Sequence, residues 1–171
     1  MQNYFELFDL ETSFLVDDEA LKKAYQAQVT RFHPDNFATK SQAVQLQALQ
    51  STSLVNSAYT ALKTPLNRAS YLLNLEDVDP FDEKDTNMDA NFLLSQIELR
   101  EQLEGIKEQQ DSLALDEFIE RVQDFIRDNV ASISGAFIQS KDLQEIKTLV
   151  RELKFYDQLN KEANILMDEW L

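Results

Sequence analysis

The 171-residue chain contains no cysteine, two glycines, three prolines and one histidine. Without cysteine it cannot form disulfides, use a thiolate in catalysis, or bind zinc or an iron–sulfur cluster through thiolates. So few glycines and prolines argue against an all-β fold, which needs many turn residues, and favour a mostly helical protein. No stretch approaches the roughly 20 apolar residues that span a bilayer, and no secretory signal pattern is visible. We therefore expect a soluble cytoplasmic protein.

The net charge of −15 is distributed unevenly along the chain. Residues 1–75 hold 6 basic and 7 acidic side chains, whereas residues 76–171 hold 10 basic and 24 acidic ones. The second part should repel nucleic acid and anionic membranes and would attract a basic partner. Alternatively, its acidic faces only keep helices in solution. In either case we expect no nucleic-acid and no membrane partner.

The residues available for catalysis are few. One histidine, no cysteine and no glycine-rich phosphate loop leave only carboxylates. The Glu-x-x-His pair that a di-iron bundle would use is missing. Glu98 and Glu101 have the spacing of metal ligands, but their helix positions predict exposure to solvent. We expect a protein that is not an enzyme and binds neither a metal nor a cofactor.

An acidic stretch with a proline, Asp77–Asp85, interrupts the helical pattern. Proline and dense like charge are typical of a linker. We predict an all-α chain with a first domain over residues 1–76, a linker over 77–88, and a three-helix bundle over 89–171.

In the first domain, apolar residues recur at helical spacing after Asp17, which is expected to cap a helix. Pro34 ends this helix because it lacks an amide hydrogen and restricts the residue before it. A second helix is expected from near Ser41 to Thr64, and a third begins at Pro65. The apolar positions noted on these helices are Leu21, Tyr25, Val29, Phe32, Leu49, Val55, Tyr59, Leu62, Ala69, Leu72 and Leu73.

In the second domain, we predict helices over about 91–107, 113–133 and 141 to near the C-terminus, the last capped by Ser140. The breaks at 109–111 and at Ser134-Gly135 are short, so neighbouring helices should pack antiparallel. Gly105 costs about 1 kcal/mol relative to alanine within a helix and is expected to kink or end the first one. The middle helix has the clearest apolar stripe, which consists of Leu115, Phe118, Ile119, Val122, Phe125, Ile126, Val130 and Ile133.

The tripeptide His33-Pro34-Asp35 falls where the first two helices must reverse. Proline stiffens this turn, and the histidine and aspartate project from it. Alone, the tripeptide is better explained as an ordinary turn. It follows an aromatic segment, Tyr4-Phe5-x-Leu7-Phe8, and a helix with Leu21-x-x-x-Tyr25, and it precedes Val55-Asn56-Ser57-Ala58-Tyr59-x-x-Leu62. This arrangement over residues 1–63 resembles the J domain.

The rest of the chain narrows the resemblance. The glycine-rich and cysteine-rich zinc modules of DnaJ-type proteins are missing, and Pro65–Leu73 leads instead into an acidic bundle. Together with Phe92–Glu101 and Arg151-x-Leu153-x-Phe155, this resembles the bacterial-type HscB family over essentially the whole chain. HscB proteins are J-domain co-chaperones of iron–sulfur cluster assembly. Asn36 departs from the family because J domains commonly carry lysine there.

The resemblance implies two protein partners. The first is the DnaK-type ATPase chaperone HscA, whose ATP hydrolysis the J domain stimulates. His33 would then be a docking contact and not a general base. The docking residues implied by the resemblance are His33, Pro34, Asp35, Lys22, Lys23, Tyr25 and Arg31. The second partner is the scaffold protein IscU, bound by the C-terminal domain. Alternatives are an adaptor for another client, or a helical scaffold whose tripeptide is a plain turn and whose basic residues form a solvated face.

An apolar cluster is predicted on the outer side of the helix that begins near residue 91. Phe92, Leu99, Leu103 and Ile106 share its core stripe. At about 100° per residue, Leu93, Leu94 and Ile97 fall outside this stripe, on the same side as Glu98 and Glu101. Exposed apolar clusters bordered by charge often mark a binding surface.

Phe155 is likewise predicted to point away from the core face of its helix, which is formed by Ile146, Leu149, Leu153 and Tyr156. The scaffold-binding candidates are therefore Leu93, Leu94, Ile97, Glu98, Glu101 and Phe155. Alternatively, these side chains are buried under the J domain or the linker, or they form a homodimer interface, with weak self-association of the chain.

Overall fold

The structure is a computed structural model that describes residues 3–171, so the first two residues of the predicted first domain lie outside it. The described residues form seven α-helices and one short 3₁₀ helix, with no strand among them. The chain divides into two compact units, Met1–Leu75 and Glu76–Leu171. The all-α fold predicted from the sequence is confirmed. Within residues 3–171, no helix has the length and apolar character needed to cross a membrane.

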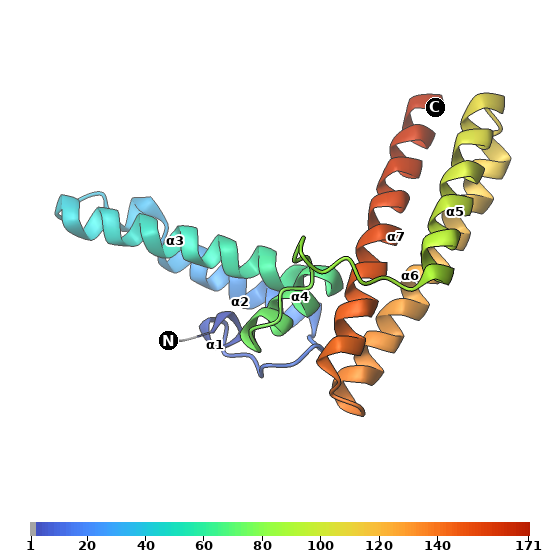
Figure 1. Cartoon of the computed structure of the whole chain (residues 1–171). Helices are drawn as coiled ribbons and strands as arrows, with labels where there is room; N and C mark the ends of the chain where they lie inside the picture. The colour runs from blue at the N-terminus through green and yellow to red at the C-terminus, as the bar shows by residue number, and fades with distance from the viewer. Residues whose placement is uncertain (1–2) are drawn as a thin grey trace. The chain divides into compact units, whose positions relative to one another are not determined.

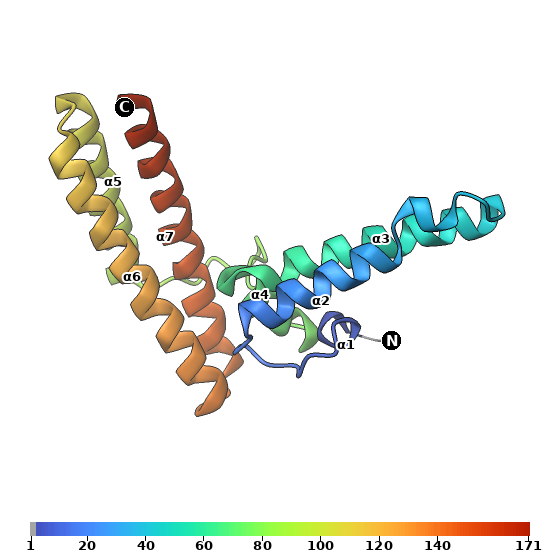
Figure 2. The same cartoon turned by 180° about the vertical axis from the view of Figure 1, so that it is seen from behind.

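The N-terminal unit is built around a helical hairpin. Its elements are α1 (Tyr4–Leu7), α2 (Asp18–Arg31), the 3₁₀ helix η1 (Pro34–Phe37), α3 (Gln42–Lys63) and α4 (Pro65–Leu75). Helices α2 and α3 lie side by side and antiparallel, and α1 and α4 pack against α3 (Figures 1 and 2). The turn that joins α2 to α3 therefore lies at one end of the hairpin.

Local capping interactions set the helix boundaries of this unit. The Asp17 carboxylate accepts the N–H groups of Glu19 and Ala20 at 3.0 and 3.3 Å, which confirms the predicted cap. The Ser41 hydroxyl accepts the N–H of Val44 at the start of α3. Such caps satisfy amides that have no partner inside the helix.

The core of the N-terminal unit contains Phe5, Leu21, Val55, Ala58 and Leu62. Leu49, one of the apolar residues noted on the second predicted helix, does not belong to this core, because its side chain is 61% exposed. The buried residue of this part of α3 is Ala48, and the next residue along a helix points about 100° away. Leu49 therefore faces away from the hairpin core.

A buried arginine, which the sequence analysis missed, joins three segments of this unit. The Arg68 guanidinium donates to the carbonyl oxygens of Phe14 and Leu62 at 2.7 and 2.8 Å and lies over the Phe14 ring. Burial lowers the pKa of Arg68, and the negative charge of Asp18 opposes this shift in part. Arg68 thus ties the loop before α2 to the end of α3.

The C-terminal unit is a bundle of α5 (Ala90–Gln109), α6 (Ser112–Ile138) and α7 (Leu143–Trp170). Helices α6 and α7 pack antiparallel along most of their length, and α5 contacts both (Figures 1 and 2). Phe92 and Leu103 of α5, Phe118 and Val122 of α6, and Leu159 of α7 belong to its core. The bundle therefore buries one face of each helix.

Three helix boundaries of this unit differ from the prediction. The predicted break at Ser134-Gly135 is wrong, because α6 continues to Ile138. Its packing residues Ile133 and Ala136 are buried on either side of Gly135, and their burial outweighs the intrinsic cost of glycine.

The residue that caps α7 is Asp142 and not Ser140, since the Asp142 carboxylate accepts the N–H groups of Gln144 and Glu145. Gly105 does not end α5, which runs on to Gln109. The break predicted at residues 109–111 is confirmed, because Gln110 ends α5 in a left-handed conformation with φ of 50°.

A half-buried glutamate makes the stability of this unit sensitive to pH. Burial, reinforced by the Asp89 carboxylate, raises the pKa of Glu152. The folded chain then binds more protons than the unfolded chain just above the ordinary glutamate pKa, so the free energy of unfolding falls as pH rises through this window. Glu152→Gln should remove this decline and raise the free energy of unfolding at neutral pH.

The measurement is urea unfolding followed by fluorescence of Trp170, the one tryptophan in the chain, between about pH 4 and pH 7. Glu169→Gln, at an exposed position of the same helix, is the control. If the free energy of unfolding differs between Glu152→Gln and the native chain by the same amount at both pH limits, the raised pKa of Glu152 is not the cause of the pH dependence.

Candidate partner-docking sites

The tripeptide His33-Pro34-Asp35, which we call the docking corner, lies at the exposed end of the hairpin. All three side chains are exposed, as the sequence predicts. The N–H of Asp35 donates to His33 Nδ1 at 3.2 Å, and the Asp35 carboxylate lies 3.6 Å from the same nitrogen. Because Nδ1 accepts, the proton of the neutral ring lies on Nε2. The docking corner therefore offers a donor, Nε2–H, and a carboxylate to a partner.

Hydrogen bonds from the neighbouring helices fix the docking corner. The Asn36 amide donates to the carbonyl oxygen of Thr30 at 2.8 Å, and the Thr52 hydroxyl donates to that of Phe32 at 3.2 Å. Both acceptors belong to the C-terminal end of α2, where carbonyl groups lack helical partners. Asn36, which stands where J domains commonly carry lysine, thus braces the turn instead of adding a charge.

The three predicted basic residues of α2 are exposed but do not share one stripe. Lys22, Lys23 and Arg31 all face solvent. Lys22 and Arg31 are nine residues apart, which places them about 180° apart around the helix, on either side of its packed face. A single flat partner surface therefore cannot contact all three residues at once.

Tyr25 is half-buried and faces α3. Its ring stacks on Tyr59 with centroids 4.0 Å apart, and its hydroxyl donates to Asn56 Oδ1 at 2.7 Å. Only the part of Tyr25 that these contacts leave exposed is available to a partner.

The predicted apolar cluster on α5 is exposed. Leu93, Leu94 and Ile97 are 43%, 58% and 55% exposed, and Glu98 and Glu101 beside them also face solvent. We call these five residues the client patch. The exposure predicted from helical spacing is confirmed, and their binding role stays a prediction.

The prediction that Phe155 points away from the bundle core is wrong. Phe155 is 7% exposed, and its ring meets the edge of Phe92 with centroids 5.8 Å apart. Helix α7 packs against two helices and not one. The two neighbours are α6 and α5. A second buried row of α7 therefore faces α5, and it consists of Phe155, Leu159 and Ala163 at four-residue spacing. Phe155 supports α5 from inside the bundle.

Arg100 covers the outer side of Phe155, a position that the sequence analysis did not single out. Its guanidinium lies 5.4 Å from the centre of the Phe155 ring and donates to Glu162 Oε2 at 3.1 Å. Arg100 follows Leu93 by two helical turns, so it borders the client patch on the same side of α5. This seven-residue spacing was the signal that the sequence carried.

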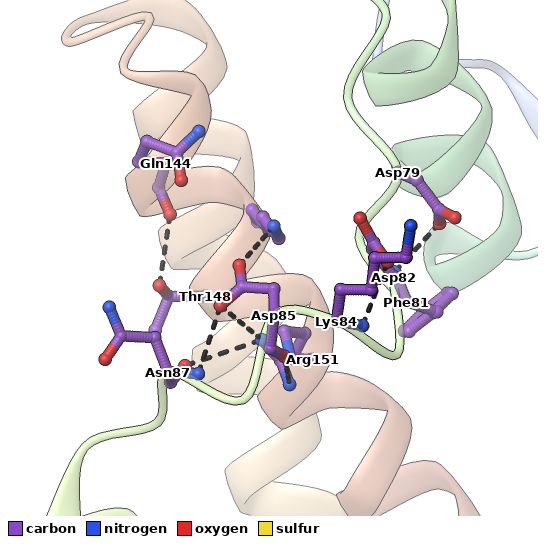
Figure 3. Close-up of polar contacts among 10 residues, drawn as sticks. Asp79, Phe81, Asp82, Lys84, Asp85, Asn87, Gln144, Thr148 and Arg151 are labelled. Carbon is purple, nitrogen blue, oxygen red and sulfur yellow. Dashed lines mark hydrogen bonds and ion pairs between the residues drawn. The ribbon is translucent and has the colours of Figure 1, made fainter.

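Part of the predicted linker is bound to α7. Asp85 forms ion pairs with Lys147 and Arg151, and Arg151 also donates to the carbonyl oxygens of Asp85 and Asn87 (Figure 3). The Lys147 hydrogen bond and the N–H of Asn87 lower the pKa of the Asp85 carboxyl. The Lys154 ammonium lies 4.2 Å from the centre of the Phe81 ring.

Over residues 3–171, no three histidine, aspartate or glutamate side chains are placed to hold a metal ion. The described sites therefore consist of a rigid corner and an apolar patch with carboxylates, both suited to contacts with other proteins.

Comparisons with known proteins agree with this geometry. The HSCB C-terminal oligomerisation domain family matches residues 88–164. A Vibrio cholerae co-chaperone protein HscB homolog is 40% identical over 170 residues, which is 99% of both chains.

Two solved structures extend the likeness to the fold. Chaperone HscB from Vibrio cholerae is 38% identical with a TM-score of 0.88, over 99% of this chain and 100% of that one. Human co-chaperone protein HscB is 30% identical with a TM-score of 0.89, over 96% of this chain and 82% of that one.

The hairpin with its docking corner, followed by a helical C-terminal unit, defines a J-domain co-chaperone. Within this class, the chain belongs to the HscB family of co-chaperones, the class that serves iron–sulfur cluster assembly. The resemblance predicted from the sequence is confirmed.

Proposed function

We propose that this HscB-family co-chaperone stimulates ATP hydrolysis by the DnaK-type chaperone HscA and brings it the iron–sulfur scaffold protein IscU, in the cytoplasm. The observation that carries the proposal is the docking corner, exposed at the hairpin end and braced by Asn36 and Thr52. A corner that is already ordered loses little entropy on binding, so its contacts contribute to affinity and specificity.

Stimulation requires that the docking corner bind two states of the chaperone differently. A ligand shifts an equilibrium only by its differential affinity for the two states. The Nε2–H of His33 and the Asp35 carboxylate provide directional contacts that fit one arrangement of the partner and not the other. His33 therefore acts as a contact, and the chemistry of hydrolysis stays in the chaperone.

The basic residues Lys22, Lys23 and Arg31 act mainly through their long-range electrostatic attraction to the chaperone. Because they are spread around α2, we assign them the attraction and orientation of an acidic chaperone surface, with direct contact from some of them. Tyr25 adds its exposed ring surface beside them. Salt should therefore weaken docking mainly through the association rate.

The client patch binds the scaffold protein. Its three apolar side chains provide area that is removed from water on binding, and Glu98 and Glu101 favour a partner that is basic at the rim. Phe155, which the sequence analysis grouped with these residues, supports the helix that carries them, and Arg100 covers it at the edge of the patch.

The test of the whole proposal is the steady-state ATPase rate of HscA with the purified chain, alone and with IscU. We expect the chain to raise the rate, and IscU to raise it further in its presence. An unchanged rate would refute the HscA assignment, and stimulation without any effect or binding of IscU would indicate an adaptor for another client.

Removing the client patch should separate the two activities. The triple variant Leu93→Ala, Leu94→Ala, Ile97→Ala is expected to weaken IscU binding about 100-fold or more, since each buried aliphatic side chain contributes about 1 kcal/mol or more. Because the three residues are exposed, the fold and the basal stimulation of HscA should not change.

Isothermal titration with IscU and the HscA assay check this prediction. The control is Leu113→Ala, which removes another exposed leucine, from the start of α6. Full-strength IscU binding by the triple variant would show that the client surface lies elsewhere.

A further inference from the structure

Asp85, Lys147 and Arg151 form a clasp between the segment before α5 and helix α7. We infer that Asp85 is a positioning residue: the clasp holds the start of α5, and with it the client patch, in the arrangement that IscU binds. This inference deepens the proposed function and rests on it.

The clasp uses both a side chain and the backbone of the segment 76–89 before α5, which we call the strap. The Asp85 carboxylate binds the Lys147 ammonium and lies 3.7 Å from Arg151 Nη1. Arg151 Nη2 donates to the Asp85 carbonyl at 2.9 Å, and Nη1 donates to that of Asn87 at 3.4 Å. Figure 3 shows Asp85 and Asn87 of the strap beside Arg151 of α7. Lys147 and Arg151 lie one turn apart on α7, so a single carboxylate reaches both.

The strap is fixed against itself at the same point. The N–H of Asn87 donates to Asp85 Oδ1 at 3.0 Å, which closes a tight turn around the carboxylate. The side chains of Lys147, Arg151 and Asp85 are partly buried, with exposures of 12%, 20% and 29%. The clasp is therefore more shielded from solvent than an ordinary surface ion pair, which contributes little.

The clasp lies close in sequence to the helix that carries the client patch. Four residues after Asp85, the Asp89 carboxylate caps α5 by accepting the N–H of Asn91 at 3.1 Å. The carbonyl of Asp89 accepts the N–H of Leu93 at 3.0 Å, the first backbone bond of the helix. Met88, which lies between Asp85 and Asp89 in the chain, packs against the core of the bundle. The clasp and the packing of Met88 therefore hold Asp89 in position, and Asp89 in turn holds the first turn of α5.

Helix ends fray unless they are held, and Leu93 completes the first turn of α5 while Leu94 begins the second. An end that frays must be ordered when a partner binds, and this ordering costs affinity. The clasp removes that cost in advance. It therefore affects IscU binding without touching IscU.

The test compares Asp85→Asn with the native full-length chain in two measurements. Amide hydrogen exchange over residues 93–97 of the free chain should become about tenfold faster, since local opening no longer breaks the clasp. Titration with IscU should give a dissociation constant about fivefold higher. Stimulation of HscA without IscU should not change.

Two further variants separate positioning from a general effect on folding. Glu83→Gln removes an exposed carboxylate of the same strap that forms no hydrogen bond or ion pair with the described residues, and it should behave like the native chain in both measurements. Asp85→Glu keeps a carboxylate within reach of Lys147 and should restore most of the protection and most of the affinity.

The inference is overturned if Asp85→Asn leaves exchange over residues 93–97 unchanged, because the clasp then does not hold α5. It is also overturned if exchange rises while IscU affinity stays native, because the clasp is then structural only. If the native chain itself fails to bind IscU, the proposed function fails and the positioning role with it. The exchange result then still reports separately whether the clasp orders α5.

Discussion

Replacing His33 by glutamine is expected to lower the stimulation of HscA about tenfold or more. This factor lies within the roughly 5–150-fold range that typical coupling free energies between two sites produce. Glutamine keeps a polar side chain of similar length. It lacks the rigid ring whose Nδ1 accepts the N–H of Asp35 and whose Nε2–H we assign to the contact with the chaperone. The measurement is the HscA ATPase rate as a function of co-chaperone concentration.

The variant should keep its fold and its affinity for IscU, because His33 is exposed and belongs to the other unit of the chain. Lys63→Gln is the matched control. It changes a polar residue at the opposite end of α3, about 30 Å from the docking corner along a helix of this length. Native stimulation by His33→Gln would remove the central residue of the proposed function.

Replacing Arg68 by methionine is expected to destabilise the N-terminal unit by about 2–4 kcal/mol, the largest stability effect that we predict. Methionine fills a similar volume but leaves the buried carbonyl groups of Phe14 and Leu62 without their donor. A buried acceptor without a partner costs about 1–3 kcal/mol. The loop before α2 then loses its connection to α3.

Amide hydrogen exchange of Leu21, Val55 and Leu62 in the full chain measures this change, since these residues belong to the core of the unit. Lys63→Met, which removes an exposed cation next in the chain to Leu62, should change the free energy of unfolding by less than about 0.5 kcal/mol. Equal effects of the two variants would contradict the role given to Arg68.

Local patterns predicted the parts of the fold that depend on neighbouring residues. Asp17 caps α2 and Pro34 starts the turn because each acts within a few residues of its own position. Helical spacing also separated the exposed client patch from the core stripe of α5. These features follow from the geometry of one helix.

Features that depend on two helices or on distant segments were not predictable in this way. Phe155 was assigned to the surface because helical spacing from one core stripe ignores the second neighbour of α7. The partners of Arg68 lie 54 and 6 residues away, and they are backbone carbonyl groups, which leave no trace in the sequence. The same holds for Asp85, whose partners on α7 lie more than 60 residues further along.

His33 is the only imidazole in the chain, and its Nδ1 is occupied by the backbone of Asp35. Its ring therefore gives the only imidazole signals in a nuclear magnetic resonance spectrum of the chain. Those signals form a built-in spectroscopic reporter at the centre of the docking corner. Binding of the chaperone can thus be followed through the imidazole signals of His33, without a probe attached to the chain.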